Sequence, residues 1–387
     1  MKFSFSTKMD QFKTSIFNEL AAFKKQKMES GMEIVDLSIG SPDLPPPTYV
    51  MEELSTHAKD PLQYGYALTG MEEFHQAIAN YYHRNYHVQV DSRNQVLTVM
   101  GSQDGLVHLP LVFCNEGDTV LVPDPGYTAY ETGISLAGAT PYPMPLLEEN
   151  HFLPDLDAIP EEIKKKAKLL ILNFPGNPVP ALATEDFFQK VVAFAKENNI
   201  AVLHDFAYSE LYYENKPISF LSVEGAKEVG IEFNSLSKSF NMAGCRVGYV
   251  TGNEIIIDAL GRLKSNLDYG IFLPIQRAAV RALEGNEPFS NDLRNIYKRR
   301  RDILVNGFNR LGWRIQKPAA SMFLWARIPS SYTSTEFAYR LIDEAGIVVT
   351  PGNAFGESGE GFVRIAYVQS EKVLHQAVEQ LAHHKFF

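Results

Sequence analysis

Cysteine, tryptophan and long apolar runs are all scarce in this chain. Its 387 residues include two cysteines, Cys114 and Cys245, and two tryptophans. Two cysteines cannot build a disulfide scaffold or a four-cysteine zinc site, and we expect no metal. No stretch approaches the ~20 apolar residues of a membrane helix, and Lys, Asp and Gln interrupt the N-terminal apolar residues. These absences predict a cytoplasmic protein with no membrane partner.

An excess of positive charge is also missing. Lys and Arg number 36 against 46 Asp and Glu, which gives a net charge of -10. A general nucleic-acid binder needs a basic face, so we expect no nucleic-acid partner. Hydrophobic residues make up 45% of the chain, enough to bury a sizeable core, and this excludes disorder or a coiled coil as the dominant state.

Short apolar segments alternate with amphipathic ones between about residues 70 and 285. This alternation predicts βαβ units and an α/β fold with a mostly parallel central sheet and flanking helices. Such a sheet binds ligands at the carboxyl ends of its strands. The expected strands are 96–100, 119–122, 169–173, 200–204, 230–233 and 247–251, and the expected helices are 70–86, 104–114, 127–137, 184–198, 254–267 and 274–284.

The two ends of the chain have sequence patterns that differ from the alternation between residues 70 and 285. Phe12, Ile16, Leu20 and Phe23 recur at helical spacing and predict an amphipathic helix that docks elsewhere. After about residue 288 comes a long charged helix, followed by short strands at 323–326 and 362–367 and helices at 335–345 and 371–382. We therefore expect an N-terminal arm (1–45), a large α/β domain (46–285) and a smaller α+β domain (286–387) with which the arm packs.

Residues 233–248 form the most informative segment. Ser235, Ser237, Lys238 and Arg246 follow a predicted strand within one turn-rich stretch. A lysine chosen at random is usually a solvated surface residue. Here two hydroxyls and a guanidinium suit a phosphate, and nearby positive charge would favour the uncharged, nucleophilic amine.

Two further segments follow predicted strands. Asp205 comes directly after strand 200–204, and Tyr208 lies three residues later. Taken alone, they read as a helix cap and a core tyrosine, although a buried carboxylate would need a cation. Asn177 lies in the proline-rich segment 172–180, which is either a plain loop or a rigid turn that presents an amide.

Two turns complete the candidate site. Ser102 and Gln103 lie in MGSQDG, a strand-to-helix turn whose backbone N–H groups could cradle a phosphate. Many α/β turns look similar, so this signal is weak by itself. Tyr127 in PDPGYTAY could stack on a flat ligand, although a core tyrosine is the commoner case.

Together these motifs form a recognisable set. Asn177, Asp205, Tyr208, Lys238 and Arg246, in this order, resemble the fold-type-I, class I/II aminotransferases that use pyridoxal phosphate. The resemblance covers essentially the whole chain. In PDPGY, HDFAYSE and IEFNSLSKSFNMAG it is closest to the branch of LL-diaminopimelate aminotransferase and methionine-pathway transaminases. It extends to LSIGSPD with Gly40, PGNAFG at 351–356 and FVRIAY at 362–367.

The resemblance implies a role for each motif. Lys238 would form the Schiff base, shuttle the proton and support ping-pong half-reactions between an L-amino acid and a 2-oxo acid. Asp205 would pair with the cofactor's ring nitrogen, and Tyr208 and Asn177 would donate to its ring oxygen. Tyr127 would stack on the ring.

The remaining implied roles concern the phosphate, the substrate and the partner subunit. Arg364 would clamp the substrate α-carboxylate, with Gly40 and Asn177 beside it. Read without the resemblance, Arg364 is an edge-strand arginine in solvent. A homodimer is implied, in which Tyr66 would reach the partner's phosphate. The phosphate would be held by Ser102 and Gln103 through their backbone amides, and by Ser235, Ser237 and Arg246.

The chain departs from the family pattern at four places. Val179 and Pro180 stand where Thr-Gly is usual, Cys245 where Trp is common and Ala320 where Gly is usual. Gly65 occupies the slot of the tyrosine that reaches the partner subunit. For that reason a neighbouring tyrosine, Tyr66 or else Tyr64, is expected to replace it.

Other readings remain open from the sequence. A pyridoxal-phosphate-dependent β-lyase could share this scaffold, because the reaction depends on which bond of the substrate stands perpendicular to the ring. A non-catalytic regulator that binds the cofactor is disfavoured by the acidic charge and the short N-terminal segment. The side chain of the amino donor is not readable from any motif.

Overall fold

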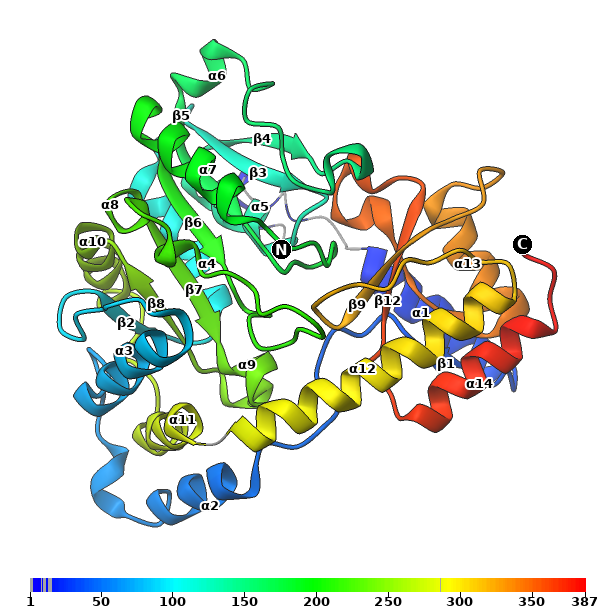
Figure 1. The fold of residues 1–387 in the computed structure, drawn as a ribbon, viewed down its shortest axis with the longest axis horizontal. Coiled ribbons are helices and arrows are strands. Elements are labelled where there is room, and N and C mark those ends of the chain that lie inside the picture. The colour runs from blue at the N-terminus through cyan, green and yellow to red at the C-terminus, as the bar shows by residue number, and fades with distance from the viewer. Residues whose placement is uncertain (1–2, 8, 10–11, 13–15, 286) are drawn as a thin grey trace.

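The computed structural model describes residues 3–7, 9, 12, 16–285 and 287–387 (Figure 1). Its largest feature is a seven-stranded sheet in the order β2-β8-β7-β6-β5-β3-β4. The strands from β7 to β4 run parallel, whereas β8 is antiparallel to both β7 and β2. The strands are β2 (Val96–Val99), β3 (Thr119–Asp124), β4 (Thr140–Pro145), β5 (Ala167–Leu172), β6 (Ala201–Asp205), β7 (Gly230–Ser235) and β8 (Gly248–Gly252).

The central strands are apolar on both faces because helices cover both. In β5, Leu169 and Ile171 pack with one cluster of buried side chains, and Leu170 and Leu172 with another. This is the period-two alternation of a strand buried on both sides. The first cluster includes α4 (Ser102–Phe113), α5 (Ala129–Ala137) and α10 (Glu254–Lys264), and the second includes α3 (Glu72–Tyr86), α7 (Glu185–Asn198) and α11 (Leu273–Glu284). The predicted α/β class with a mostly parallel sheet is confirmed.

Apart from one-turn helices, two elements of this part were not predicted. β4 contains Pro141, Pro143 and Pro145, which argue against a central strand. It is tolerated because β4 is an edge strand that pairs only with β3. Helix α2 (Thr48–His57) follows a proline-rich loop and has no side-chain hydrogen bond at its N-cap, so its start carries no capping signal. The short helices α6 (Glu161–Lys164), α8 (Ala226–Val229) and α9 (Leu236–Ser239) complete this part.

A second core lies toward the C-terminus. The strands β9 (Phe323–Arg327), β11 (Thr350–Pro351) and β12 (Phe362–Ala366) form an antiparallel sheet in the order β11-β12-β9. The long helix α12 (Glu287–Arg310) runs alongside α14 (Glu371–Ala382), and α13 (Ser334–Ala345) lies next to the sheet (Figure 1). Small strand and helix elements therefore mix here, as the sequence predicted.

The N-terminal helix packs against this second core. Helix α1 (Ile16–Glu29) buries Leu20 against Ile342 and Val348. Strand β1 (Val35–Asp36) pairs in parallel with β10 (Ile347–Val348). Phe12 lies outside the helix, and residues 13–15 are outside the described residues. Helix α1 therefore lies beside α13, while the division into an arm and two domains at 45 and 285 stays a prediction.

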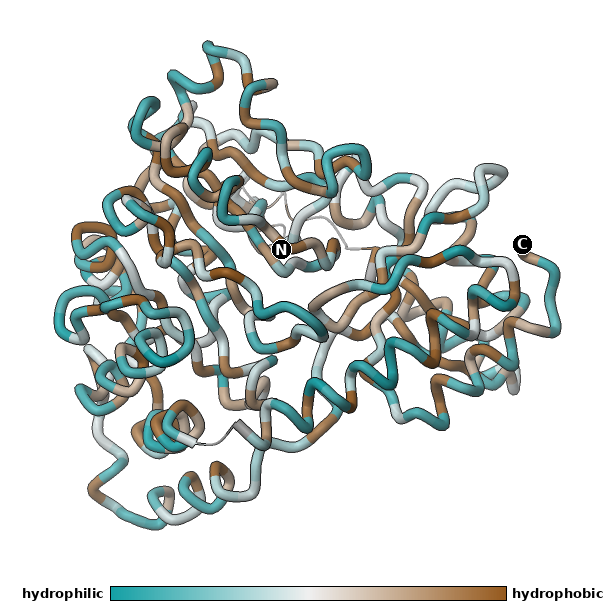
Figure 2. The backbone as a smooth tube through the Cα atoms, viewed as in Figure 1, coloured by the Kyte–Doolittle hydropathy of each residue, from teal (hydrophilic) through white to brown (hydrophobic). Residues whose placement is uncertain are grey.

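The distribution of hydrophobic residues agrees with this arrangement of strands and helices. Figure 2 shows hydrophobic residues concentrated along the central strands and more hydrophilic ones on the outer loops and helices. Across the described residues, no helix is both long and apolar enough to cross a membrane.

Candidate active site

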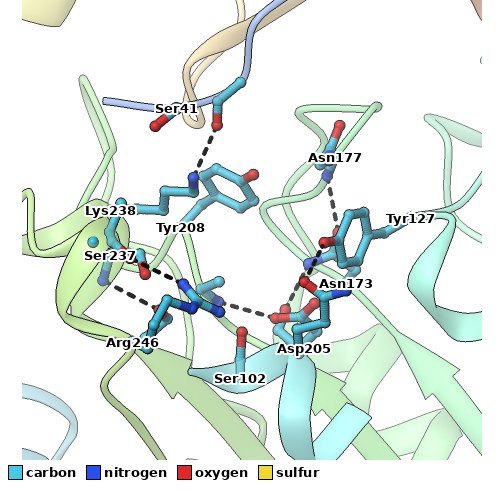
Figure 3. A pocket seen from close by; sticks show the side chains of 16 residues that line it. Ser41, Ser102, Tyr127, Asn173, Asn177, Asp205, Tyr208, Ser237, Lys238 and Arg246 are labelled. Carbon is cyan, nitrogen blue, oxygen red and sulfur yellow. Dashed lines mark hydrogen bonds between the residues drawn. The ribbon is translucent and has the colours of Figure 1, made fainter. Parts of the chain in front are cut away.

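A cavity of about 470 Å³ lies where β5, β6 and β7 end. Its volume falls within the roughly 300–1,000 Å³ of small-molecule sites. Parallel strands place their carboxyl ends on one edge of the sheet, so the loops that follow them meet there. Figure 3 shows side chains from these loops turned toward one another. The lining residues are Gly40, Ser41, Ser102, Gln103, Tyr127, Asn173, Asn177, Asp205, Ala207, Tyr208, Ser235, Ser237, Lys238, Ala243, Gly244 and Arg246.

Lys238 carries a partly buried amine. It lies on the short helix α9 directly after β7, and the Ser235 hydroxyl caps that helix by accepting the Ser237 N–H at 3.1 Å. The Lys238 Nζ donates to the Gly40 carbonyl at 2.8 Å. Burial, followed by the positive charges of Arg364 and Arg246, lowers the pKa of Lys238 to about 8. An appreciable fraction of this amine is therefore uncharged near neutral pH.

Asp205 is the acidic group of the cavity. It ends β6 and is 4% exposed. The Tyr130 hydroxyl donates to its Oδ2 at 2.8 Å, and the Ala207 N–H donates to its Oδ1 at 3.3 Å. Burial raises the pKa of Asp205, whereas these hydrogen bonds oppose the rise. A cationic partner within the cavity would lower the cost of keeping this carboxylate ionised.

A cradle for an anion forms at the N-terminus of α4. Gly101 has a φ of +77°, and a Cβ there would lie 2.5 Å from Nη2 of Arg246. A Cβ on Gly248 would lie 2.9 Å from the backbone nitrogen of Ser102. These positions need glycine because the helix N-terminus and the guanidinium approach so closely. Free N–H groups, the helix dipole and an arginine together suit a phosphate.

Arg364 is a further cation beside the site and is 4% exposed. It donates from Nη1 to Asn177 Oδ1 at 2.7 Å, and from Nη2 to the Ser38 carbonyl at 2.6 Å. It lines a neighbouring cavity that shares Gly40 with the first. Burial lowers the pKa of Arg364 to about 10, so the guanidinium is still charged at neutral pH. Its position is that of a buried cation available to a carboxylate.

Two tyrosines form the aromatic wall of the cavity. The Tyr127 hydroxyl donates to Gln103 Oε1 at 3.4 Å, and its ring meets Tyr130 edge-on. Tyr208 is buried against Phe323, and burial raises the pKa of its hydroxyl. Both rings therefore have positions set by packing before any ligand binds.

The structure brings most of the predicted site residues together. Arg364 lies in the adjoining cavity, whereas Tyr66 is 83% exposed and packs against Tyr269 instead of entering the cavity of its own chain. The predicted residues that line the first cavity are Gly40, Ser102, Gln103, Tyr127, Asn177, Asp205, Tyr208, Ser235, Ser237, Lys238 and Arg246.

Sequence reasoning did not assign two residues that support the site. Tyr130 lies three residues after Tyr127 within the helix predicted over 127–137, and this spacing was a usable signal, although α5 itself begins at Ala129, after Tyr127. Asn173 donates from Nδ2 to the Asp205 carbonyl at 2.7 Å and accepts the Asn177 N–H at 2.8 Å. Its partner on β6 is 32 residues away, so no local pattern indicates this contact.

Comparisons with known proteins agree with this geometry. Residues 32–381 match the family model described as aminotransferase class I and II. The chain belongs to the class I and II aminotransferases. An LL-diaminopimelate aminotransferase from Moorella thermoacetica is 46% identical over 91% of both chains, and one from Aquifex aeolicus is 43% identical over 98% of both.

Solved structures place the fold in the same group. A substrate-bound BacF structure from Bacillus subtilis has a TM-score of 0.95 and 38% identity, and covers 100% of this chain and 98% of its own. A Thermus thermophilus aspartate aminotransferase double mutant has a TM-score of 0.91 and 27% identity, over 99% and 100% of the two chains. The enzyme is a pyridoxal-phosphate-dependent aminotransferase, and no finding favours the β-lyase alternative.

The residues present fit this cofactor. An anion cradle that only glycine permits, a partly buried amine and a buried carboxylate all face one cavity of the aminotransferase. These are the groups that a phosphate, an aldehyde and a ring nitrogen require. Within the described part of the chain, no three His, Cys, Asp or Glu side chains gather as a metal site.

Proposed function

We propose that Lys238 is the catalytic amine of this aminotransferase and that Arg246, with the N-terminus of α4, holds the cofactor phosphate. The observation that carries the proposal is the partly buried Lys238 amine, with its pKa lowered to about 8, in the same cavity as Asp205 and the glycine-lined cradle. Backbone amides of Ser102 and Gln103 and the hydroxyls of Ser235 and Ser237 complete the phosphate site.

The other side chains of the cavity have separate proposed roles toward the cofactor and the substrate. Pyridoxal phosphate, when bound, supplies an aldehyde that captures amines and a ring that accepts electrons. Asp205 holds the proton on the ring nitrogen, and Tyr208 with Asn177 donates to the ring oxygen. Tyr127 excludes water from one face of the ring. As an uncharged amine, Lys238 would act as the general base that takes the proton from the substrate Cα.

Arg364 binds the substrate α-carboxylate in this proposal. Its planar guanidinium can make two parallel hydrogen bonds to a carboxylate, and Asn177 already orients it through the 2.7 Å contact. Gly40 borders both cavities and leaves room beside the carboxylate. The proposed substrates are an L-amino acid donor and a 2-oxo acid acceptor.

For the donor, we propose a diaminopimelate-like or methionine-like amino acid. The similarity to relatives named LL-diaminopimelate aminotransferase, at 40–46% identity, supports the first of these. The resemblance of the PDPGY and HDFAYSE segments to the same branch supports both.

A homodimer is the proposed assembly. Large apolar side chains at Leu62, Tyr64, Tyr66, Leu68 and Tyr269 are 51–85% exposed, a grouping that favours a protein interface. Tyr66, or else Tyr64, would then reach the partner's cofactor phosphate. The cytoplasmic location expected from the sequence stays a prediction.

A panel of amino donors tests the proposed function. The enzyme loaded with pyridoxal phosphate is mixed with single L-amino acids, diaminopimelate and methionine included, and with 2-oxoglutarate or pyruvate. We expect one 2-oxo acid to form for each acceptor consumed, and Lys238→Ala to lose both the exchange and the visible absorbance of the bound cofactor. Release of ammonia or thiol without an acceptor would instead indicate a lyase.

A further inference from the structure

A buried lysine beside the proposed phosphate cradle has no part in the chemistry described so far. Lys264 is the last residue of α10, and its side chain is only 5% exposed. Its Nζ donates to Oδ2 of Asp104 at 3.1 Å and also to Oδ2 of Asp268. An ammonium loses its water on burial, and two carboxylates compensate for that loss here. Lys264 therefore links α4, which carries Asp104, to the loop that follows α10.

Asp104 connects this ammonium to the cradle. It lies in the first turn of α4, and its Oδ2 also accepts the Met100 N–H at 2.9 Å. Its Oδ1 lies 2.8 Å from Nδ1 of His108, one helical turn further along α4. The carboxylate thus closes the turn 100–104, whose backbone amides are proposed to hold the phosphate, and Lys264 fixes the carboxylate from α10.

The charge of Lys264 matters as well as its position. A phosphate bound to the amides of this turn lies within one helical turn of the Asp104 residue, and like charges repel. Burial raises the pKa of Asp104, but hydrogen bonds from His108 and the Met100 N–H, with the charge of Lys264, hold the pKa at about 2. The carboxylate is therefore ionised when the phosphate binds, and the adjacent ammonium offsets the repulsion.

The second carboxylate, Asp268, leads to the exposed aromatic side chains. Its Oδ1 accepts the Gly270 N–H at 2.7 Å. Gly270 has a φ of +85°, and a Cβ there would lie 1.9 Å from the Ala67 carbonyl oxygen. The Ala67 N–H donates to the Tyr269 carbonyl at 3.2 Å, and the rings of Tyr66 and Tyr269 are 4.9 Å apart. Asp268 therefore fixes the loop against which Tyr66 packs.

We propose that Lys264 is a positioning residue for the cofactor phosphate in both subunits of the dimer. Through Asp104 it holds the turn that binds the phosphate of its own subunit. Through Asp268 it holds the loop that supports Tyr66, the side chain directed to the phosphate of the partner. The inference rests on the phosphate site and the homodimer of the proposed function.

Pyridoxal, which lacks the phosphate, separates this role from a purely structural one. The probes are pyridoxal phosphate and pyridoxal, and the readout is the dissociation constant of each. Lys264→Met keeps most of the side-chain length but removes the charge. We expect it to weaken binding of pyridoxal phosphate roughly tenfold, the loss typical of one charge-assisted hydrogen bond, and to leave binding of pyridoxal unchanged.

Arg262→Met is the matched control on the same helix. It removes the same charge, but Arg262 pairs with Asp258 at the surface, where both side chains are at least 70% exposed. We expect neither dissociation constant to change. Equal losses for the two probes in Lys264→Met, or no loss, would overturn the inference. If wild-type enzyme binds pyridoxal as tightly as pyridoxal phosphate, the proposed phosphate site itself fails, so the two failures are distinguishable.

Failure of Lys264→Met to fold would reflect the two carboxylates left without a cation. The double variant Lys264→Met, Asp268→Asn removes one charge of each sign and leaves Asp104 without its ammonium, so the same loss specific to pyridoxal phosphate is expected.

Hydrogen exchange of the wild-type enzyme provides a test that needs no variant. Relative to pyridoxal, pyridoxal phosphate should slow exchange in residues 100–104 and also in residues 268–270, because Lys264 joins the two segments. Slower exchange in residues 100–104 alone would contradict the proposal.

Discussion

At the scale of single residues, the environment of Lys238 determines when it reacts. A protonated amine cannot attack an aldehyde, and the pKa of Lys238 is lowered from 10.5 to about 8. We therefore expect the rate of cofactor capture by the apoenzyme to rise with pH up to about 8 and then to level off. Stopped-flow absorbance over neutral to alkaline pH measures this rate. A rate that kept rising beyond pH 8 toward the ordinary lysine pKa of 10.5 would contradict the lowered pKa.

Arg364 gives a second prediction at this scale. Lysine in its place keeps the charge but cannot form the planar two-bond contact, and one charge-assisted hydrogen bond contributes about 1.5–3 kcal/mol. Arg364→Lys should therefore raise KM by roughly 10- to 100-fold for every amino acid alike, because all share the α-carboxylate. Steady-state kinetics with several donors measures the effect. A loss limited to one class of side chain would mean that Arg364 reads the side chain instead.

At the scale of elements, Asp104 joins α4 to α10. Burial raises the pKa of Asp104, but hydrogen bonds from His108 and the Met100 N–H, with the Lys264 ammonium 3.1 Å away, outweigh it and hold the pKa at about 2. A carboxyl with a lowered pKa stabilises the fold above its unfolded pKa of 3.8 and loses that contribution as pH falls toward 2. The contribution amounts to about 2 kcal/mol.

Asp104→Asn tests this link between the helices. Because asparagine does not titrate, the free energy of unfolding of the variant should fall less between about pH 4 and about pH 2 than that of the wild-type enzyme, by about 2 kcal/mol. Urea unfolding at a series of acidic pH values gives both curves. Parallel curves would show that Asp104 has an ordinary pKa.

The two unpredicted elements show what local patterns omit. Strand propensity disfavours the prolines of β4, and only its place at the edge of the sheet makes them acceptable. The N-terminus of α2 has no capping side chain, and its contacts with α11 lie more than 200 residues along the chain. Both elements are stabilised by contacts with other parts of the chain, which a short stretch of sequence does not reveal.

At the scale of the whole molecule, one contact joins the seven-stranded sheet to the C-terminal core beside the active site. Asp124 ends β3 and accepts the Ser358 hydroxyl at 2.8 Å, while the Gly126 N–H donates to the Phe355 carbonyl at 2.8 Å. Asp124 is 8% exposed, and burial raises its pKa. These hydrogen bonds therefore connect the end of β3 and the turn after it to residues 355–358 of the C-terminal core.

Ser358→Ala should weaken that connection. Removing the hydroxyl leaves a buried carboxylate with one donor fewer, which costs about 1–3 kcal/mol of unfolding free energy. Hydrogen exchange in residues 352–359 should also become faster, because the segment opens more readily. Ser358→Thr retains the hydroxyl and is the control. Unchanged exchange in Ser358→Ala would mean that the backbone contacts suffice.

The sequence by itself determined the alternation of strands and helices, and with it the meeting of Asn177, Asp205, Lys238 and Arg246. Periodicity encodes the elements, and parallel strands bring the loops after them to one edge. Tertiary structure decided the contacts between distant segments. Arg364 reaches Asn177 across 187 residues, and Glu232 meets His204 behind the site. Such pairs depend on how elements pack, and packing is set by the whole core.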